Sequence, residues 1–483
     1  MERHAATGLL RKPDGTLPHR LARSAATLDG ATPNSELADW IAERNAAHRH
    51  EVTRIRFDQL RQWHFDPAGG DLRHDSGRFF RVQGLSVRTD YGHVRHWTQP
   101  IINQPEIGIL GILVREVDGV LHCLMQAKSE PGNVNGVQLS PTVQATKSNY
   151  TRVHGGKPVP YLDFFRDPPP EQVLADVLQS EQGSWFYRKR NRNMVVEVTD
   201  DPRFDDGAEL PEDFRWLTLG QLHALLRVDN LVNMDARTVL SCMPAPAPAP
   251  FGEPSTDLAD AVARSAQPTA GGLHTTTEVM SWITSRQAAH YVDTTAVPLH
   301  EVRGWRRTDA EISHELGLYF SIVAVDITTN GREVASWSQP LVRPFGTGVV
   351  ALLVKRVEGV LHALVNARVE PGYLDVVELA PTVQCTPENY DHLPPGDHPP
   401  FLDVVRASTP EQVLFSTQLS EEGGRFYHAH SEYQIIEVAP DFPDAGLADF
   451  RWLTVHQLNE LLRHSHYVNV QARSLLACLR GLR

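Results

Sequence analysis

The chain has 483 residues, 41% of them hydrophobic and 22% charged, and carries a formal net charge of −13. This composition is typical of a globular protein of about three domains, and the acidic balance argues against a nucleic-acid binder. No stretch approaches the roughly 20 apolar residues that span a bilayer, and the N-terminal region has no apolar signal core. We therefore expect a cytosolic protein without a membrane segment. The four cysteines are far apart, so we expect free thiols.

The first half of the chain predicts helices and short strands. Residues 1–34 are expected to be flexible, and an amphipathic helix is predicted near Glu36–His48. Two β-branched runs, 108–114 and 120–125, flank Asp118-Gly119 and predict a β-hairpin.

Further along, the sequence predicts a second helix, a strand and a closing helix. Pro170 occupies a favourable first position for a helix over 171–181, in which apolar residues fall on one face. Residues 194–198 predict a strand, and a leucine stripe predicts the closing helix over 218–226. The unit is therefore expected to be α+β with a mixed sheet.

The same unit then occurs a second time. Trp97-Thr-Gln-Pro100 recurs 240 residues later as Trp337-Ser-Gln-Pro340, and Glu130-Pro-Gly132 recurs as Glu370-Pro-Gly372. A Pro/Ala-rich run separates the copies and is typical of an extended linker. The predicted organisation is a tandem duplication with these bounds: a first repeat over 35–243, a linker over 244–272 and a second repeat over 273–483.

Two common kinds of site are not supported by the sequence. Gly346–Ala351 fits a dinucleotide-binding pattern formally, but it leads into a strand and not into the helix that such a site needs. The 23 histidines are scattered without carboxylates or cysteines at ligand spacing, so no metal site is predicted.

The densest polar segment is 126–156, and it indicates a pocket. On a strand, Gln126, Lys128 and Glu130 point to one face, and Thr142 and Gln144 do so on a neighbouring strand. Such side chains line a pocket with hydrogen-bonding groups. The alternative is a solvated sheet face that ends in a Pro-Gly turn.

A second concentration, 185–193, places aromatic residues beside four cations. Arginine forks suit phosphate oxygens and aromatic faces stack on bases, so the segment resembles a nucleotide-diphosphate cradle. The alternative is a basic surface strand.

The long polar strings of the first repeat resemble those of the NDP-hexose 2,3-dehydratases of deoxysugar pathways, and so does the duplication. The strings are QAKSEPGN, QLSPTVQAT-x-SNY and QSEQGSWFYRKRNRN, and the resemblance covers nearly the whole chain. It implies a homodimer whose subunits contain two Nudix-like α/β/α modules. It also implies an enzyme that acts on TDP-4-keto-6-deoxy-glucose without a redox cofactor.

A Nudix-type hydrolase of nucleotide sugars is the first alternative. It needs several carboxylates on a helix to hold magnesium, whereas Thr417–Gly424 keeps only Glu421 and Glu422, and Val177–Ser184 keeps one glutamate. Hydrolysis is therefore disfavoured. The second alternative is a catalytically inactive nucleotide-sugar binding protein.

For the dehydratase, the first repeat is expected to be the active copy, because the second replaces Lys128 with Arg368 and the cations of 188–192 with the residues of 428–432. The second copy is expected to be vestigial. Candidate acid/base residues are Glu130, Tyr150 and His154, and Lys128 is the candidate donor to an enolate oxygen. Glu130 has an alternative role as a structural carboxylate of its turn, because Glu370 persists in the second copy.

The remaining candidates are substrate-binding residues. Arg190 and Arg192 are the predicted diphosphate ligands, and the others are expected around the base or sugar: Trp97, Gln99, Gln126, Asn133, Thr142, Gln144, Asn149, Trp185 and Tyr187. The expected 3,4-diketo product can lose its nucleotide by further elimination. We therefore expect functional coupling to an NADPH-dependent 3-ketoreductase that consumes it.

Overall fold

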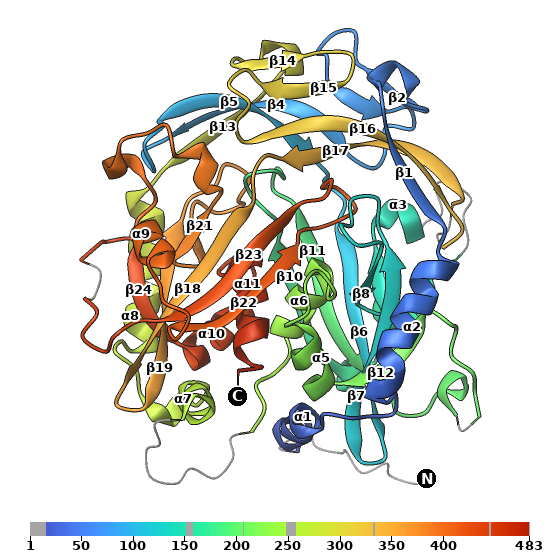
Figure 1. Ribbon diagram of the computed structural model, residues 1–483, viewed down its shortest axis with the longest axis vertical. Helices are drawn as coiled ribbons and strands as arrows, with labels where there is room; N and C mark the ends of the chain where they lie inside the picture. Colours follow the sequence, from blue (N-terminus) through green and yellow to red (C-terminus); the bar gives the residue numbers. More distant parts are fainter. Residues whose placement is uncertain are drawn as a thin grey trace, which may run out of the picture.

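The computed structural model describes residues 16–150, 158–205, 207–247, 257–331, 334–443 and 446–482, with only the backbone of residues 149 and 150. The architecture is mixed α+β with two similar halves, as the repeat predicts (Figure 1). The first half contains α1 (Leu17–Ala26), α2 (Asn34–Ala47), β1 (His50–Ile55), β2 (Trp63–Phe65), β3 (Leu72–His74), β4 (Arg81–Thr89), β5 (His96–Asn103), β6 (Gly108–Val117), β7 (Val120–Ser129), β8 (Val137–Ser140), β9 (Val143–Ala145), α3 (Lys147–Tyr150), α4 (Asp163–Arg166), β10 (Val173–Ser180), β11 (Arg190–Glu197), β12 (Phe214–Thr218), α5 (Leu219–Leu225) and α6 (Met234–Ser241).

The second half repeats this order, except that a 3₁₀ turn, Pro387–Asn389, takes the place of α3. It contains α7 (Leu258–Ser265), α8 (Thr276–Ala289), β13 (Val292–Val297), β14 (Trp305–Arg307), β15 (Glu311–His314), β16 (Phe320–Thr329), β17 (Ser336–Pro344), β18 (Gly348–Val357), β19 (Val360–Arg368), β20 (Glu378–Ala380), β21 (Val383–Cys385), α9 (Leu402–Arg406), β22 (Val413–Ser420), β23 (His430–Glu437), β24 (Phe450–Thr454), α10 (Val455–Leu462) and α11 (Val470–Leu479).

A large mixed sheet forms the body of each half. In the first half its strands lie in the order β10-β11-β6-β7-β12, with β8 beside β7 and β9 beside β6, and β6 and β11 run parallel. The predicted hairpin of β6 and β7 is confirmed, and its turn residues Asp118 and Gly119 have φ angles of 50° and 75°, as a two-residue turn between twisted strands requires.

Strand β6 is buried on both faces. Leu110 and Ile112 join the core beneath α1, α2, α5 and α6, whereas Ile109 and Leu113 join the core that contains Phe165 of α4. Helices therefore cover both faces of the sheet. The two large sheets lie side by side, and α6 and α11 pack against each other between them (Figure 1).

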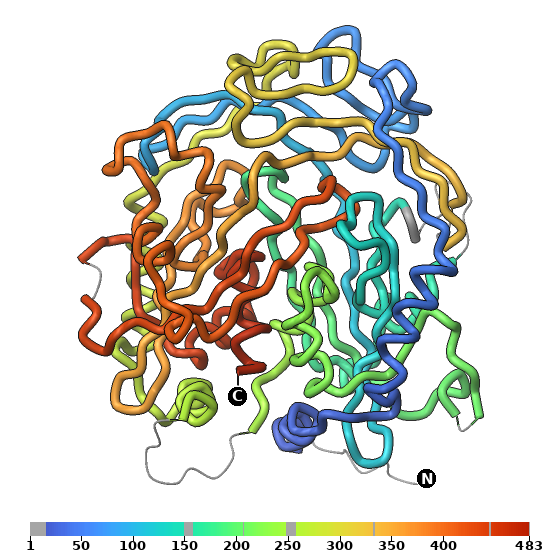
Figure 2. The backbone as a smooth tube through the Cα atoms, viewed as in Figure 1, coloured from blue at the N-terminus to red at the C-terminus, as the bar shows by residue number. Residues whose placement is uncertain are grey.

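The two halves exchange strands in the smaller sheets. Strand β1 of the first half pairs antiparallel with β16 of the second, and β13 of the second half pairs antiparallel with β4 of the first. Both smaller sheets lie at one end of the molecule, opposite α1 and α7 (Figure 2). The repeats are therefore intertwined, and neither smaller sheet belongs to a single copy.

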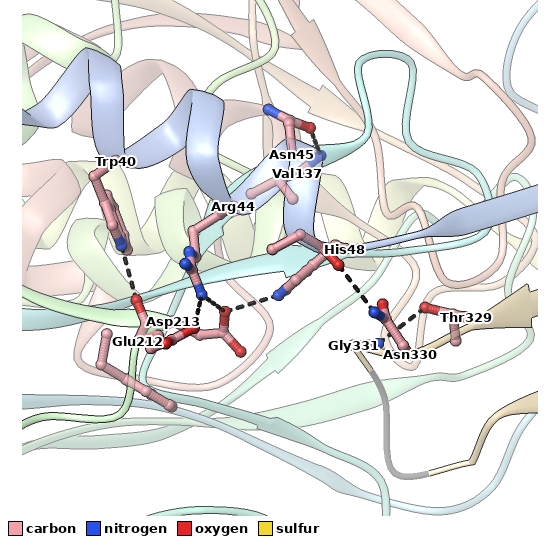
Figure 3. Close-up of polar contacts among 12 residues, drawn as sticks. Trp40, Arg44, Asn45, His48, Val137, Glu212, Asp213, Thr329, Asn330 and Gly331 are labelled. Carbon is pink, nitrogen blue, oxygen red and sulfur yellow. Dashed lines mark hydrogen bonds and ion pairs between the residues drawn. The ribbon is translucent and has the colours of Figure 1, made fainter.

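The chain crosses between the halves at the end of α2 (Figure 3). His48 and Arg44 contact the carboxylate of Asp213, with 2.7 Å between His48 Nε2 and Asp213 Oδ1, and this fixes the end of the helix to its own half. The Asn330 amide, just past β16, donates to the carbonyl of Ala47. This contact guides the following strand, β1, to its partner in the other half.

One predicted helix is wrong. Residues 171–181 form a single 3₁₀ turn and then strand β10, which pairs with β11. A bulge between Val173 and Ala175 shifts the pairing register and disrupts the two-residue alternation, so the apolar residues imitate helical spacing. The other predicted helices and the strand over 194–198 are confirmed, and the closing helix begins with a capping box of Thr218 and Gln221.

Two segments expected to be flexible or extended contain helices. Helix α1 buries Leu21 and Ser24, and the Ser24 hydroxyl donates to the carbonyl of Leu121. Helix α7 follows the same plan in the second half, where Ser265 donates to the carbonyl of Leu361. The structural repeat therefore begins at α1 and α7, before the boundaries that the sequence predicts. In the described parts of the chain, no helix is long and apolar enough to cross a membrane.

Candidate active site

A cavity opens at the end of the large sheet of the first repeat, where the second repeat contacts it. It encloses about 530 Å³, counting the part open to solvent. The first repeat contributes most of its lining: Gln104, Gly108, Leu110, Lys128, Glu130, Gln144, Ala145, Thr146, Glu181, Phe186, Lys189, Asn191 and Asp235. The second repeat contributes Glu422, Gly424 and Arg425. The site is therefore composite.

Lys128 and Glu130 form a buried ion pair in this cavity. Lys128 Nζ lies 3.2 Å from Glu130 Oε1 and donates to the carbonyl of Gln144 at 3.1 Å. The Gln144 side chain donates to Glu130 Oε1 at 3.3 Å and accepts from Asn233 at 3.1 Å. These contacts hold an ammonium and a carboxylate in fixed positions at the cavity wall.

Three further carboxyl groups line the cavity, and burial disfavours their charged forms. Burial raises the pKa of Glu422 to about 7, and Glu181 and Glu130 add to the effect against the guanidinium of Arg425. Burial also raises the pKa of Asp235 well above its ordinary value, and the nearby carboxylate of Glu422 raises it further. The pKa of Glu181 is raised chiefly by burial. Burial in the cavity thus favours the protonated forms of these carboxyl groups, and the pKa of Glu422 lies near neutral pH.

Cations lie among these carboxyls. Burial lowers the pKa of Lys189 to about 8, and its ammonium donates to the carbonyl of Glu106. Arg425 donates from Nε to Gln104 at 3.1 Å and from Nη1 to the carbonyl of Gly424 at 2.7 Å. An amine with a lowered pKa beside carboxyl groups with raised pKa values equips the site for proton transfer, and the guanidinium suits an anionic group.

The absence of a side chain at Gly424 makes room for two carboxylates. A Cβ there would lie 2.5 Å from Glu422 Oε1 and 3.5 Å from Glu130 Oε2. A residue larger than glycine would therefore displace the Glu422 side chain. The matched position in the first repeat is Ser184.

Among the predicted site residues, the structure brings Lys128, Glu130 and Gln144 together in the cavity. His154 lies outside the described residues, as do the side chains of Asn149 and Tyr150.

The other predicted residues lie outside the lining of this cavity. Arg190 and Arg192 alternate with the lining residue Asn191 along β11, so they face the opposite side of the strand, and Arg192 pairs with Asp176 at 2.6 Å. The expected diphosphate ligands are thus not in the cavity.

The predicted aromatic and amide residues have structural contacts instead. Trp97 donates to Gln99 at 2.8 Å, and Gln99 donates to the carbonyl of Ser184 at 2.8 Å. Trp185 packs against Phe426, and Tyr187 packs in a small core of the β4–β5 sheet.

The remaining three predicted residues lie on or near β7. Thr142 accepts from the amide of Leu113 at 2.9 Å, and Asn133 donates to the carbonyl of Gly136 at 2.7 Å. Gln126 is on β7 and is not part of the cavity lining. The polar groups of Thr142 and Asn133 stabilise the strands and the turn that shape the site.

Sequence reasoning did not assign Lys189, Asp235, Glu422 and Arg425 to the site, although Lys189 lies in the singled-out segment 185–193 and Glu422 in the suspected Nudix remnant. Each is a position where the two repeats differ in charge: the matched residues are Ala429, Gln471, Gln182 and Trp185. By contrast, the Lys128–Glu130 pair has a close counterpart, because Arg368 contacts Glu370 at 2.7 Å. Comparing the ionisable residues of the two repeats would therefore have identified these four positions from the sequence.

The strings that the sequence suggests as Nudix remnants do not form a helix. Thr417–Ser420 end strand β22, and Glu421–Gly424 form the turn that follows it. Among the residues that the structure describes, no group of three or more His, Cys, Asp or Glu side chains is arranged to hold a metal ion. The helix-borne magnesium motif is thus not formed by these strings.

Comparisons with known proteins agree with the doubled architecture. A family model described as NDP-hexose 2,3-dehydratase matches residues 34–243 and 276–479. A dTDP-4-dehydro-6-deoxy-alpha-D-glucopyranose 2,3-dehydratase of Saccharopolyspora spinosa is 54% identical over 94% of this chain and 93% of its own length.

Proteins with the same description from two other organisms are similarly related. That of Amycolatopsis orientalis is 49% identical over 95% of this chain and 93% of its own length, and that of Streptomyces violaceoruber is 51% identical over 92% and 96%. Both repeats take part in these matches. The chain belongs to the NDP-hexose 2,3-dehydratase family.

Proposed function

We propose that this protein removes water across carbons 2 and 3 of dTDP-4-keto-6-deoxy-D-glucose and releases a 3,4-diketo-2,6-dideoxy sugar nucleotide. One observation carries the proposal: the first repeat has a cavity in which an amine, a guanidinium and carboxyl groups with raised pKa values converge. About half of the chain's residues are identical to those of relatives named for this reaction.

The chemistry needs proton transfer and charge stabilisation. The carbon 4 ketone acidifies the proton on carbon 3, and a base removes it to leave an enolate. The carbon 2–oxygen bond then breaks, its electron pair leaves with the oxygen, and an acid protonates that oxygen to give water. The remaining enol moves its hydroxyl proton to carbon 2 and becomes the diketone, so the net loss is one water molecule.

In this assignment, Lys128 donates to the enolate oxygen and Glu130 removes the proton from carbon 3. Lys128 is held by Gln144 and Glu130, and a fixed ammonium stabilises developing negative charge without reorganising. Glu130 Oε1 forms the ion pair with Lys128 and accepts from Gln144, whereas Oε2 lies on the Gly424 side of the cavity. The structural role of Glu130 remains the alternative, because Glu370 is held in the same way by Arg368 and Gln384.

Arg425 and Lys189 replace Arg190 and Arg192 as the proposed partners of the substrate's diphosphate, because they line the cavity. A guanidinium offers two parallel donors to phosphate oxygens. A diphosphate bound at Arg425 orients the sugar so that carbon 2, next to the linked carbon 1, lies near the second repeat.

We also propose a module fold, an oligomeric state, a coupled enzyme and a cellular location. Each subunit is proposed to contain two Nudix-like modules, which a mixed sheet with helices on both faces supports. The resemblance to the family implies that two such subunits form a homodimer. Coupling to an NADPH-dependent 3-ketoreductase is supported by the reactivity of a 3,4-diketone. The four free cysteines fit the cytosol, where thiols stay reduced.

The function is tested by incubating the protein with dTDP-4-keto-6-deoxy-glucose and excess chelator. The assay is run with and without a 3-ketoreductase and NADPH, and the products are detected by mass. Loss of water and trapping of a 2,6-dideoxy-4-keto sugar are the expected results. Cleavage of the diphosphate only after magnesium is added indicates a Nudix-type hydrolase instead. Binding of dTDP without any change in the sugar indicates an inactive binding protein.

A further inference from the structure

The second repeat does more than duplicate the first: it places ionisable groups in the first repeat's cavity. Glu422 and Arg425 both come from the turn between β22 and β23. The matched turn of the first repeat carries Gln182 and Trp185, which do not ionise. The two turns therefore bring different chemistry to the opposite repeat.

The backbone of this turn is fixed against the first repeat. The amide of Gly132 donates to the carbonyl of Gly423 at 2.7 Å, and the amide of His428 donates to the carbonyl of Gly132 at 2.9 Å. Gln339 donates to the carbonyl of Gly424 at 2.8 Å. Glu422 thus approaches the cavity from a rigid turn, as a group that reacts with a bound substrate must.

Two buried polar atoms that line the cavity with Glu422 have no hydrogen-bond partner in the described part of the chain and suit a polar ligand. Glu181 Oε2 and Gln104 Nε2 are buried and make no hydrogen bond among the described residues. Both residues line the cavity. A buried donor and a buried acceptor are costly when unpaired, so each fits a group that a bound substrate supplies.

Gln182 is the residue of the first repeat that matches Glu422, and it has a structural role. Its amide donates to Glu421 Oε2 at 3.0 Å inside the protein, a structural contact. No hydrogen bond of the Glu422 carboxyl occurs within the described residues, and its oxygen lies beside the space that Gly424 leaves open. Glu422 is thus available to a substrate where Gln182 is not.

We propose that Glu422 is the general acid of the dehydration, donating its proton to the oxygen that leaves carbon 2, while Arg425 holds the diphosphate. The inference rests on the proposed function. Carbon 2 is bonded to carbon 1, which carries the diphosphate, so the acid must lie next to the group that holds the phosphates. Glu422 and Arg425 meet this requirement from one turn.

The proton balance of the step is complete. The carbon 2–oxygen bond breaks heterolytically, its electron pair stays on the oxygen, and the proton of Glu422 converts the departing hydroxide to water. The proton taken from carbon 3 by the base restores the protonation of the site after turnover. The charged and titratable groups around Glu422 are Glu130, Glu181, Lys189, Asp235 and Arg425.

Hydrogen–deuterium exchange of the substrate distinguishes a general acid at carbon 2 from the base that removes the carbon 3 proton. In D₂O, removal of the carbon 3 proton is read as deuterium in recovered substrate, and elimination is read as loss of water. Glu422→Gln is expected to lose elimination by about 10²–10⁴-fold, the usual contribution of general acid catalysis, and to keep exchange at carbon 3. Glu432→Gln is the control, because it removes a carboxylate of the same repeat that contacts Ser416 outside the cavity.

Two results overturn the assignment. One is wild-type elimination by Glu422→Gln, and the other is loss of exchange and elimination together while dTDP still binds. A wild-type protein that neither exchanges nor eliminates refutes the proposed function itself, which is a separate outcome.

A second measurement uses the wild-type enzyme, so it does not depend on whether a variant folds. With the wild-type enzyme, the ratio of elimination to exchange is expected to fall as the pH rises through about 7, where Glu422 loses its proton. A ratio that stays constant across this range rejects Glu422 as the acid.

Discussion

The amide of Gly132 donates to the carbonyl of Gly423 at 2.7 Å, and the amide of Gly372 donates to the carbonyl of Gly183 at the same distance. Each Glu-Pro-Gly turn thus binds the turn after β10 or β22 in the opposite repeat. The two contacts are related by the internal repeat, but only the first joins the Glu130 turn to the residues that complete the cavity.

Gly132→Ala is expected to destabilise the protein and abolish turnover. A Cβ at this position would lie 1.6 Å from the carbonyl oxygen of Phe426, so the backbones must separate. Overpacking of this kind costs about 1–3 kcal/mol of unfolding free energy. Urea denaturation and the dehydration assay measure the two effects.

The matched variant is Gly372→Ala, whose Cβ would lie 1.8 Å from the carbonyl oxygen of Phe186. It is expected to cost similar stability, with a smaller loss of turnover in the protein that remains folded. Equal losses of turnover in both variants contradict the assignment of the active cavity to the first repeat.

Gln339 is expected to act as a positioning residue for the cavity. It accepts from Trp337 and donates to the carbonyl of Gly424, just as Gln99 accepts from Trp97 and donates to the carbonyl of Ser184. Removing either side chain takes one hydrogen-bond donor from a carbonyl, at a cost of about 1 kcal/mol. Only Gln339→Ala loosens the turn that carries Glu422.

Melting temperatures and steady-state kinetics test this difference. Gln339→Ala and Gln99→Ala are expected to lower the melting temperature by similar amounts, and only Gln339→Ala is expected to lower kcat strongly. A larger kcat effect for Gln99→Ala contradicts the positioning role and favours a direct contact of Gln99 with substrate.

The sequence was sufficient to predict the doubled α+β architecture, because strings such as Trp97–Pro100 and Trp337–Pro340 keep their register. It was insufficient for β10, where a bulge at Val173 gives strand residues a helical spacing. It was also insufficient for the strand exchange, because β1 and β13 occupy matched positions and their side chains do not specify which copy of the partner strand they join.

The site also contains residues that the sequence predicts and residues that it does not. Lys128, Glu130 and Gln144 were predictable, because a polar run at a strand end is costly unless it serves a pocket or solvent. Glu422 and Arg425 are more than 290 residues from Lys128 and reach the cavity only through the docking of one repeat on the other. Local patterns carry no information about that docking.

Arg425→Leu is expected to weaken nucleotide binding more than it slows the chemical step. The guanidinium is held by Gln104 and packs over the ring of Phe80, so the proposed phosphate donor is preorganised. Loss of a charge-assisted bidentate contact corresponds to about 1.5–3 kcal/mol, or roughly 10–100-fold in Kd. Calorimetric titration with dTDP measures this change, and an unchanged Kd excludes Arg425 as a phosphate ligand.

Asp235→Asn is expected to make the melting temperature less sensitive to a rise in pH. Burial, and then the neighbouring Glu422 and Glu181, raise the pKa of Asp235 well above its ordinary value, so folding favours the protonated form. That contribution to stability is fully present below the unfolded pKa of about 3.9 and is lost as the pH rises through the raised folded value.

An amide cannot ionise, and the second repeat has Gln471 at the matched position, where its side chain is buried. The variant's melting temperature is therefore expected to exceed that of the wild type by an amount that grows with pH. Thermal denaturation across a pH series measures this difference. A difference that is constant with pH would mean that Asp235 ionises in the folded protein as readily as in the unfolded chain, and the cavity would then hold one more negative charge than the acid–base assignment allows.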